Sequence, residues 1–155
     1  MLKYRIMISL NISISEQKLS VLNSGKIIKI YPISTSRFGI GSEKSSNKTP
    51  TGNFMISEKI GELEPIFTTF KERKPVGVWN AKSTDDDLIL SRILWLDDID
   101  NNHNTKERYI YIHGTNHENL IGTPASHGCI RMKNRDVIEL FDLVEIASKI
   151  SIVTK

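Results

Sequence analysis

Two strand-like runs joined by a tight turn constrain most strongly what this chain can fold into. The runs make up residues 18–34, KLSVLNSGKIIKIYPIS, and Asn23, Ser24 and Gly25 separate them. Turn residues between two runs rich in apolar and β-branched side chains are typical of a β-hairpin. Upstream, residues 4–10 carry an apolar or aromatic side chain at every second position, the period of a half-buried strand. The N-terminal half therefore predicts β-structure.

The rest of the chain extends this prediction to a mainly β fold with one helix. Further strands are expected at residues 53–57, 88–96, 108–113 and 150–153. The glycine- and serine-rich stretch 36–54 predicts an ordered loop, whereas residues 58–87 show no clear pattern. The helix is expected to begin at Asn134, which can cap it. Its apolar residues at helical spacing are Val137, Leu140, Phe141 and Val144.

Length and composition are those of a soluble single-domain protein. The 155 residues fit one domain spanning 1–155, with 39% apolar and 25% charged residues. The net charge is +3 and no long run of like charges occurs, which argues against a dedicated nucleic-acid surface. No apolar run approaches the ~18 residues of a membrane-spanning helix. The single cysteine excludes an internal disulfide.

The N-terminal segment does not have the pattern of a cleavable signal peptide. It is MLKYRIMISLNISISEQ, with a short apolar stretch that polar residues interrupt and no small-residue cleavage site after it. We therefore expect a cytoplasmic protein without membrane partners. If the sequence is a piece of a longer exported chain, the expected location is instead the periplasm or the cell wall.

The segment 109–134, YIYIHGTNHENLIGTPASHGCIRMKN, gathers the only thiol and three of the four histidines. A thiol is a useful nucleophile only as the thiolate, which near pH 7 requires a base or a positive field. His113 ends a predicted strand, and turn residues after it allow the chain to return Cys129 to the imidazole. Gly128 leaves room for backbone N–H groups to form an oxyanion hole, and we expect the carbonyl of Gly114 to orient the base. A Cys–His pair with backbone donors predicts acyl transfer.

The same residues allow two other interpretations. Cys129 could be a small buried apolar residue without chemistry, the common role of a lone cysteine. A zinc ion could instead be bound by His113, His117, His127 and Cys129, although their spacing matches none of the strong zinc signatures. Outside such a site, His103 and His117 are expected to be solvated loop residues. His127 is then expected to brace its own turn.

Three motifs together resemble a known enzyme family. IHGT at 112–115, SHGCIRM at 126–132 and NKTPTGNF at 47–54 are similar to segments of the L,D-transpeptidase catalytic domain, the YkuD family. The resemblance extends from about residue 3 to residue 153. It implies a β-sandwich or barrel-like fold with one helix following the catalytic cysteine.

The resemblance also implies a role for each residue of the motifs. It implies Cys129 as the nucleophile, His113 as the base and His127 as a helper in the oxyanion region. Arg131 would otherwise be interpreted as a surface ion-pair partner. The implied substrate-binding side chains are Arg131, Ser126 and Thr115. No metal and no organic cofactor is implied.

The implied substrates are peptidoglycan stem tetrapeptides or muropeptides, cut at the L,D bond before the terminal D-alanine through an acyl-thioester. Family members without a signal sequence resemble L,D-carboxypeptidases, which transfer the acyl group to water during murein recycling. Hydrolysis is therefore the outcome that we expect. One alternative is an exported L,D-transpeptidase that forms 3–3 cross-links. An alternative of another class is a non-catalytic domain that binds peptidoglycan fragments.

Overall fold

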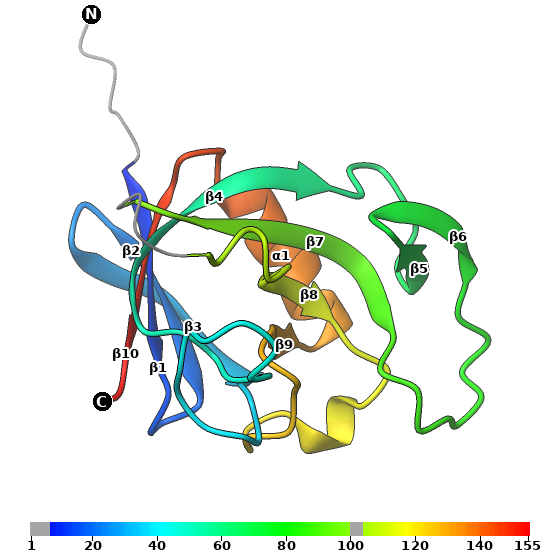
Figure 1. Cartoon of the computed structure of the whole chain (residues 1–155). Coiled ribbons are helices and arrows are strands. Elements are labelled where there is room, and N and C mark those ends of the chain that lie inside the picture. The colour runs from blue at the N-terminus through cyan, green and yellow to red at the C-terminus, as the bar shows by residue number, and fades with distance from the viewer. Residues whose placement is uncertain (1–6, 100–103) are drawn as a thin grey trace, which may run out of the picture.

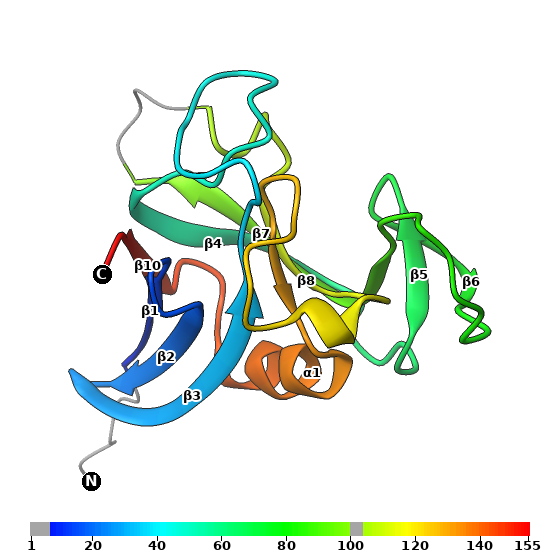
Figure 2. The ribbon, with the colours of Figure 1, turned by 90° about the horizontal axis from the view of Figure 1, so that it is seen from below.

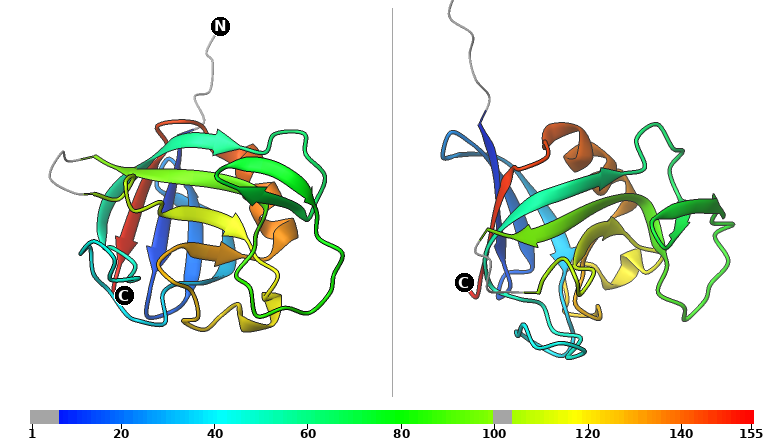
Figure 3. Two further views of the ribbon diagram at one scale, coloured as in Figure 1. Left: turned by 45° about the vertical axis from the view of Figure 1, so that its right-hand side comes forward. Right: turned by 45° about the horizontal axis from the view of Figure 1, so that its top comes forward.

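The strands of the protein form one sheet that closes into a barrel. The computed structural model describes residues 7–99 and 104–155. The strands are β1 (Ile8–Ser13), β2 (Lys18–Asn23), β3 (Lys26–Ser34), β4 (Gly52–Ile60), β5 (Thr68–Lys71), β6 (Lys74–Val78), β7 (Ile89–Asp98), β8 (Tyr111–Gly114), β9 (Ile130–Met132) and β10 (Lys149–Val153). Their order is β4-β10-β1-β2-β3-β9-β8-β7, and β4 also pairs with β7, which closes the ring (Figures 1 and 3). The expected mainly β, barrel-like fold is confirmed.

The β5–β6 hairpin lies outside the closed ring. β5 pairs with β6 on one side and with β7 on the other. In Figure 2 the hairpin therefore stands to the side of the barrel, beyond β7 and β8. The hairpin falls within residues 58–87, where the sequence showed no pattern. Every residue of β6 is exposed, so this strand has no alternation of buried and exposed side chains that a sequence pattern could reveal.

The predicted strands are present with small shifts in their ends. The hairpin expected at residues 18–34 is formed by β2 and β3, which a two-residue turn of Ser24 (φ 49°) and Gly25 (φ 84°) joins. Positive φ at both turn residues matches the twist of an antiparallel pair. β8 begins at Tyr111, three residues after its predicted start at 108. Residues 4–6 of the first predicted strand, and His103, lie outside the described residues.

The one α-helix of the described residues, α1 (Asn134–Leu143), packs against β7 and β8 (Figure 1). A short 3-10 helix, η1 (Glu118–Leu120), follows β8. The helical spacing of buried Val137, Leu140 and Phe141 is confirmed, and these side chains complete the core inside the barrel. The prediction that Asn134 caps the helix is wrong. The capping position is Lys133, and the Asn134 side chain is buried within the fold.

The side-chain amide of Asn134 joins β7 to the segment that follows β8. Its Oδ1 accepts a hydrogen bond from Ser91 Oγ at 2.7 Å, and its Nδ2 donates to the carbonyl of Thr115 at 2.8 Å. The residue therefore ties β7 to the end of β8 and cannot turn back to cap its own helix. In the described parts of the chain, no helix is long and apolar enough to cross a membrane.

Candidate active site

The parallel pairing of β8 with β9 brings the histidine and cysteine motifs side by side. Ile112 is opposite Ile130, and His113 is opposite Arg131. Ile112 and Ile130 point into the core. Because side chains alternate along a strand, His113 and Arg131 lie on the opposite face of the sheet. Cys129, two residues before Arg131, lies on that same face.

The thiol of Cys129 is half-buried against the backbone that leads into β8. The N–H of Tyr111 donates to Sγ at 3.4 Å, and the thiol donates to the carbonyl of Tyr109 at 3.3 Å. Burial raises the pKa of the Cys129 thiol to about 11, although the N–H of Tyr111 favours the thiolate. The Cys129 thiol is therefore neutral near pH 7.

The imidazole of His113 is buried and held in one orientation. Its Nδ1 lies 2.7 Å from the carbonyl oxygen of Gly114, so the expected orienting contact is present. A carbonyl only accepts, so Nδ1 carries the hydrogen and Nε2 is the nitrogen free to take a proton. Burial lowers the pKa of His113, and the charge of Asp87 opposes this effect only in part. A Cβ on Gly114 would lie 2.7 Å from the carbonyl oxygen of Leu90, which explains the glycine.

The turn that presents Cys129 is braced by hydroxyl groups. Ser126 Oγ accepts the N–H of Gly128 at 3.2 Å and donates to the carbonyl of Cys129 at 2.6 Å. Thr49 Oγ1 donates to the carbonyl of Gly128 at 2.9 Å. Gly128 has φ of +122°, a conformation that side chains disfavour. The Gly128 N–H is engaged by Ser126, whereas the N–H groups of His127 and Cys129 have no protein acceptor among the described residues.

Asp87 enters the site from the loop that precedes β7. Its Oδ2 lies 2.9 Å from Nη2 of Arg131 and 3.7 Å from Nδ1 of His127. Burial acts to raise the pKa of the Asp87 carboxyl, but the charges of His113 and Arg131 outweigh it and hold the pKa below its usual range. The sequence interpretation missed Asp87. The only local signal was a run of three aspartates directly before a predicted strand.

Two residues just after β8 hold the Asp87 loop in place. The Nδ2 of Asn116 donates to the carbonyl of Asp86 at 2.9 Å, and its Oδ1 accepts the N–H of Leu88 at 3.0 Å. His117 Nε2 lies 2.8 Å from the carbonyl oxygen of Thr84. The expectation that His117 is a solvated loop residue is therefore wrong, because its ring is partly buried against this loop. The side-chain amide of Asn116 thus holds the residues on both sides of Asp87.

The three residues expected to bind substrate lie below the surface. Thr115 and Ser126 are fully buried, and Arg131 is 3% exposed. The hydroxyl of Thr115 accepts the N–H of His117 at 3.0 Å, and that of Ser126 braces the cysteine turn. The guanidinium of Arg131 forms an ion pair with the carboxylate of Asp87. Contact with substrate would require these internal partners to be displaced, so we propose that all three position the site.

The side chains of the alternative zinc site have different partners. His113 contacts Gly114, His117 contacts Thr84 and His127 faces Asp87. Within residues 7–99 and 104–155, no group of three or more His, Cys, Asp or Glu side chains is arranged to hold a metal ion. The residues around Cys129 therefore fit nucleophilic chemistry better than metal coordination.

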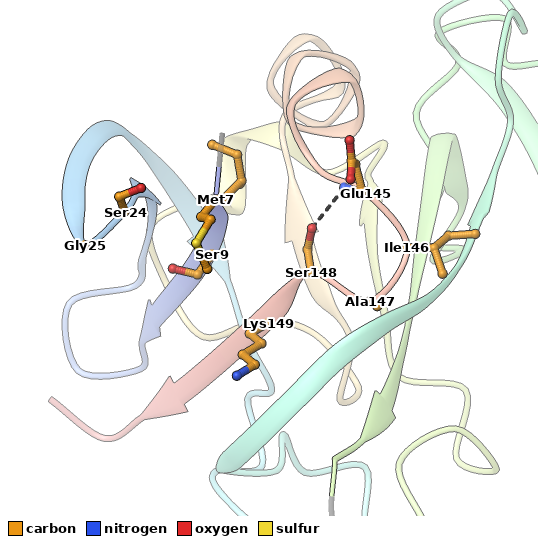
Figure 4. Close-up of a pocket in the computed structure, with 10 residues that line it drawn as sticks. Met7, Ser9, Ser24, Gly25, Glu145, Ile146, Ala147, Ser148 and Lys149 are labelled. Carbon is orange, nitrogen blue, oxygen red and sulfur yellow. Dashed lines mark hydrogen bonds between the residues drawn. The ribbon is translucent and has the colours of Figure 1, made fainter. Parts of the chain in front are cut away.

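A cavity of about 240 Å³ adjoins the thiol side of the site. It is lined by residues 44, 45 and 47, by residues 107–110 and by His127. Tyr109, whose carbonyl binds the thiol, forms part of its wall. A larger hollow of about 480 Å³ lies between the start of β1 and the segment that connects α1 to β10 (Figure 4). None of its lining residues belongs to the candidate site, so the smaller cavity is the relevant one.

Comparison with known proteins agrees with this geometry. The family model described as the L,D-transpeptidase catalytic domain, YkuD, matches residues 3–152. The chain belongs to this family. It is similar to the protein YkuD of Bacillus subtilis, with 29% identity over 96% of this chain and 68% of that protein. The similarity to this relative therefore extends over almost the whole chain.

Solved L,D-transpeptidase structures share the fold. An L,D-transpeptidase from Mycobacterium smegmatis aligns with a TM-score of 0.63 and 17% identity, over 96% of this chain and 59% of that one. L,D-transpeptidase 3 from Mycobacterium tuberculosis, solved with a faropenem-derived adduct, aligns with a TM-score of 0.61 and 16% identity over 95% and 60%. The chain thus spans about three fifths of the length of these structures.

Proposed function

We propose that this L,D-transpeptidase-family enzyme transfers the acyl group of a peptidoglycan stem tetrapeptide through a thioester on Cys129. The observation that carries the proposal is the hydrogen bond between His113 Nδ1 and the Gly114 carbonyl. It leaves Nε2 unprotonated on the face of the sheet that also bears the thiol. The donor class follows from the family and from the names of its members, which are L,D-transpeptidases.

In the first step the thiol of Cys129 attacks the carbonyl of the L,D bond while Nε2 of His113 takes the thiol proton. A new S–C bond forms, and the carbonyl oxygen becomes an oxyanion beside the N–H of Cys129. When the C–N bond breaks, the imidazolium returns its proton to the leaving amine of D-alanine. The enzyme is then a thioester, and the imidazole is neutral again. Because burial favours the neutral thiol and the neutral imidazole, proton transfer and attack are coupled.

We propose that water resolves this thioester more readily than a second stem does. Three segments surround the thiol, and each is held by a side chain. The loop 41–48 is held by Arg108, whose Nη2 donates to the carbonyl of Lys48 at 2.7 Å. Asn116 holds the Asp87 loop, and Arg73 holds the β5–β6 hairpin through Tyr111. A small acceptor needs less room among these segments than a bulky amine, which supports an L,D-carboxypeptidase acting on soluble muropeptides in murein recycling.

The test offers a disaccharide tetrapeptide alone and then with an excess of a second stem or of a D-amino acid. Mass spectrometry of the products should detect tripeptide and free D-alanine as the main products in both cases. Predominant 3–3 dimers would contradict hydrolysis and favour the cross-linking transpeptidase. Absence of any product, with the protein folded, would contradict acyl transfer on this donor.

A further inference from the structure

The tip of the β5–β6 hairpin is built from two residues in a rarely adopted conformation. Glu72 and Arg73 form the two-residue turn between β5 and β6, with φ of 49° and 65°. Such a turn normally contains glycine or asparagine, because positive φ is unfavourable for residues with long side chains. Backbone strain of this kind persists where the surrounding contacts hold it, and it often marks a functional position. The contacts of Arg73 therefore decide what this turn does.

The guanidinium of Arg73 is placed on an aromatic surface. Its central carbon lies 4.9 Å from the ring centre of Trp95 and 5.3 Å from that of Tyr109. Its Nη1 donates to the hydroxyl of Tyr111 at 3.3 Å. The three aromatic rings also pack on one another, with centres 5.6–6.4 Å apart. Stacking on these rings fixes the position of the cation but does not neutralise it.

Two tyrosines connect this cation to the thiol. Tyr111 donates its backbone N–H to Cys129 Sγ and accepts from Arg73 at its hydroxyl, so the two contacts stand at opposite ends of one residue. Tyr109 likewise offers its carbonyl to the thiol and its ring to the guanidinium. Among the described residues, no carboxylate lies within ion-pair distance of Arg73. The buried Arg131, in contrast, is already paired with Asp87.

We propose that Arg73 binds a carboxylate of the donor stem peptide while Cys129 attacks its L,D bond. A guanidinium presents paired N–H donors that match the two oxygens of a carboxylate. In this structure one of those donors binds the hydroxyl of Tyr111. Among the described residues, no carboxylate forms an ion pair with the guanidinium. The carboxylate is either that of the terminal D-alanine or one on the diamino acid. The inference rests on the proposed function, because it assigns a specificity residue to that site.

The experiment measures both binding and turnover for three donors. One tetrapeptide carries all its carboxylates, a second is amidated at the terminal D-alanine, and a third is amidated on the diamino acid. Affinities are measured by calorimetry in the Cys129→Ala background, with Arg73 intact or replaced in R73Q and R73K. The matched control is Lys106→Gln. Lys106 also lies over Trp95, at 5.1 Å, but its charge is paired with Glu58.

R73Q should weaken binding of the free-acid donor about 10- to 100-fold, the range for a hydrogen bond to a charged group. R73Q should have little effect on the amidated donor that lacks the carboxylate recognised by Arg73. The donor that is insensitive to R73Q therefore shows whether Arg73 binds the carboxylate of D-alanine or that of the diamino acid. In the active enzyme the same change should raise KM more than it lowers kcat, and R73K should restore part of the loss. K106Q should leave the preference among donors unchanged.

Equal weakening of all three donors by R73Q would overturn the proposal, because a residue that only fastens the hairpin does not distinguish a carboxylate from an amide. An identical pattern in K106Q would overturn it as well, in favour of general surface charge. If wild-type protein turns over none of the donors, the proposed function fails. The binding measurements still decide the role of Arg73, since they need no reaction.

Discussion

At the scale of single residues, the site is defined by two groups that burial keeps uncharged. Cys129 has a raised pKa and His113 a lowered one, and desolvation is the largest cause of each shift. A preformed thiolate–imidazolium pair would react with any electrophile that reached it. In the proposed mechanism, the neutral pair reacts when an oriented carbonyl couples attack to proton transfer. The hydrogen bond from His113 to Gly114 supplies that orientation on the enzyme's side.

The pH dependence of alkylation tests the resting state of Cys129. In the free enzyme, the rate of iodoacetamide labelling should keep rising to about pH 11, because the thiolate forms only there. Mass spectrometry of the labelled protein follows the rate. Cys129→Ala should show no adduct and no turnover, with an unchanged circular dichroism spectrum. A labelling rate that levels off below pH 9 would contradict a neutral resting thiol.

The two histidines of the site should not be equivalent. His113→Ala should lower kcat about 10²–10⁴-fold, the usual contribution of a general base. His127→Ala should cost less, because the His127 side chain is 47% exposed and lies 3.7 Å from Asp87. Steady-state kinetics measure both effects, and thermal unfolding checks that each variant is folded. A larger loss in His127→Ala would reverse the roles proposed for the pair.

At the scale of elements, the loop before β7 brings a carboxylate to the candidate site. Asn116 binds the backbone on both sides of Asp87, and Asp87 pairs with Arg131 on β9. The loop thereby joins the end of β8 to β9 across the outer face of the barrel. Its carboxylate also lies within the electrostatic reach of His113, whose pKa it raises. A residue of a surface loop thus influences the pKa of the buried His113.

Asp87→Asn should shift the acidic limb of the kcat/KM profile to lower pH. Removing the carboxylate takes away the charge that raises the pKa of His113 and leaves the opposing charge of Arg131 in place. The imidazole then stays neutral, and able to act as a base, at lower pH. The exposed neighbour provides the matched control, and Asp86→Asn should leave the limb in place. A shift of the limb to higher pH in Asp87→Asn would contradict this electrostatic role.

At the scale of the whole molecule, the same two groups limit the pH range of greatest stability. The native state resists protonation of His113, so the free energy of unfolding should fall as pH drops below the ordinary histidine value of 6.5. It also resists ionisation of Cys129, so stability should fall again as pH rises from the ordinary thiol value of 9.0 toward about 11. Between pH 6.5 and pH 9.0, neither His113 nor Cys129 lowers the free energy of unfolding.

Urea unfolding across this range measures the effect. The difference in unfolding free energy between wild type and Cys129→Ala should be constant up to about pH 9 and should then decrease. That difference isolates the thiol from other groups that titrate in alkali, such as Tyr31. A difference independent of pH up to 11 would show that the thiol has the same pKa in the folded and unfolded chains.

Local sequence by itself determined the elements that carry the chemistry. The turn at Ser24 and Gly25, the helical spacing from Val137 onward and the strand that contains His113 are each encoded within a few residues, so pattern alone predicted them. The contact between His113 and Gly114 was predictable for the same reason, because the two residues are adjacent. The strand β6 was not predictable from local sequence, since all its residues are exposed and show no alternating pattern.

Only the tertiary structure decided which charges meet around Cys129. Asp87 reaches Arg131 because β8 and β9 pair in parallel beside the loop before β7, and Arg73 reaches Tyr111 because the β5–β6 hairpin extends the sheet from β7. Thr115 and Ser126 are buried in the folded chain, and their hydroxyls bind the backbone N–H groups of His117 and Gly128. Ion pairs and burial depend on segments far apart in the chain, and no local pattern records how those segments come together.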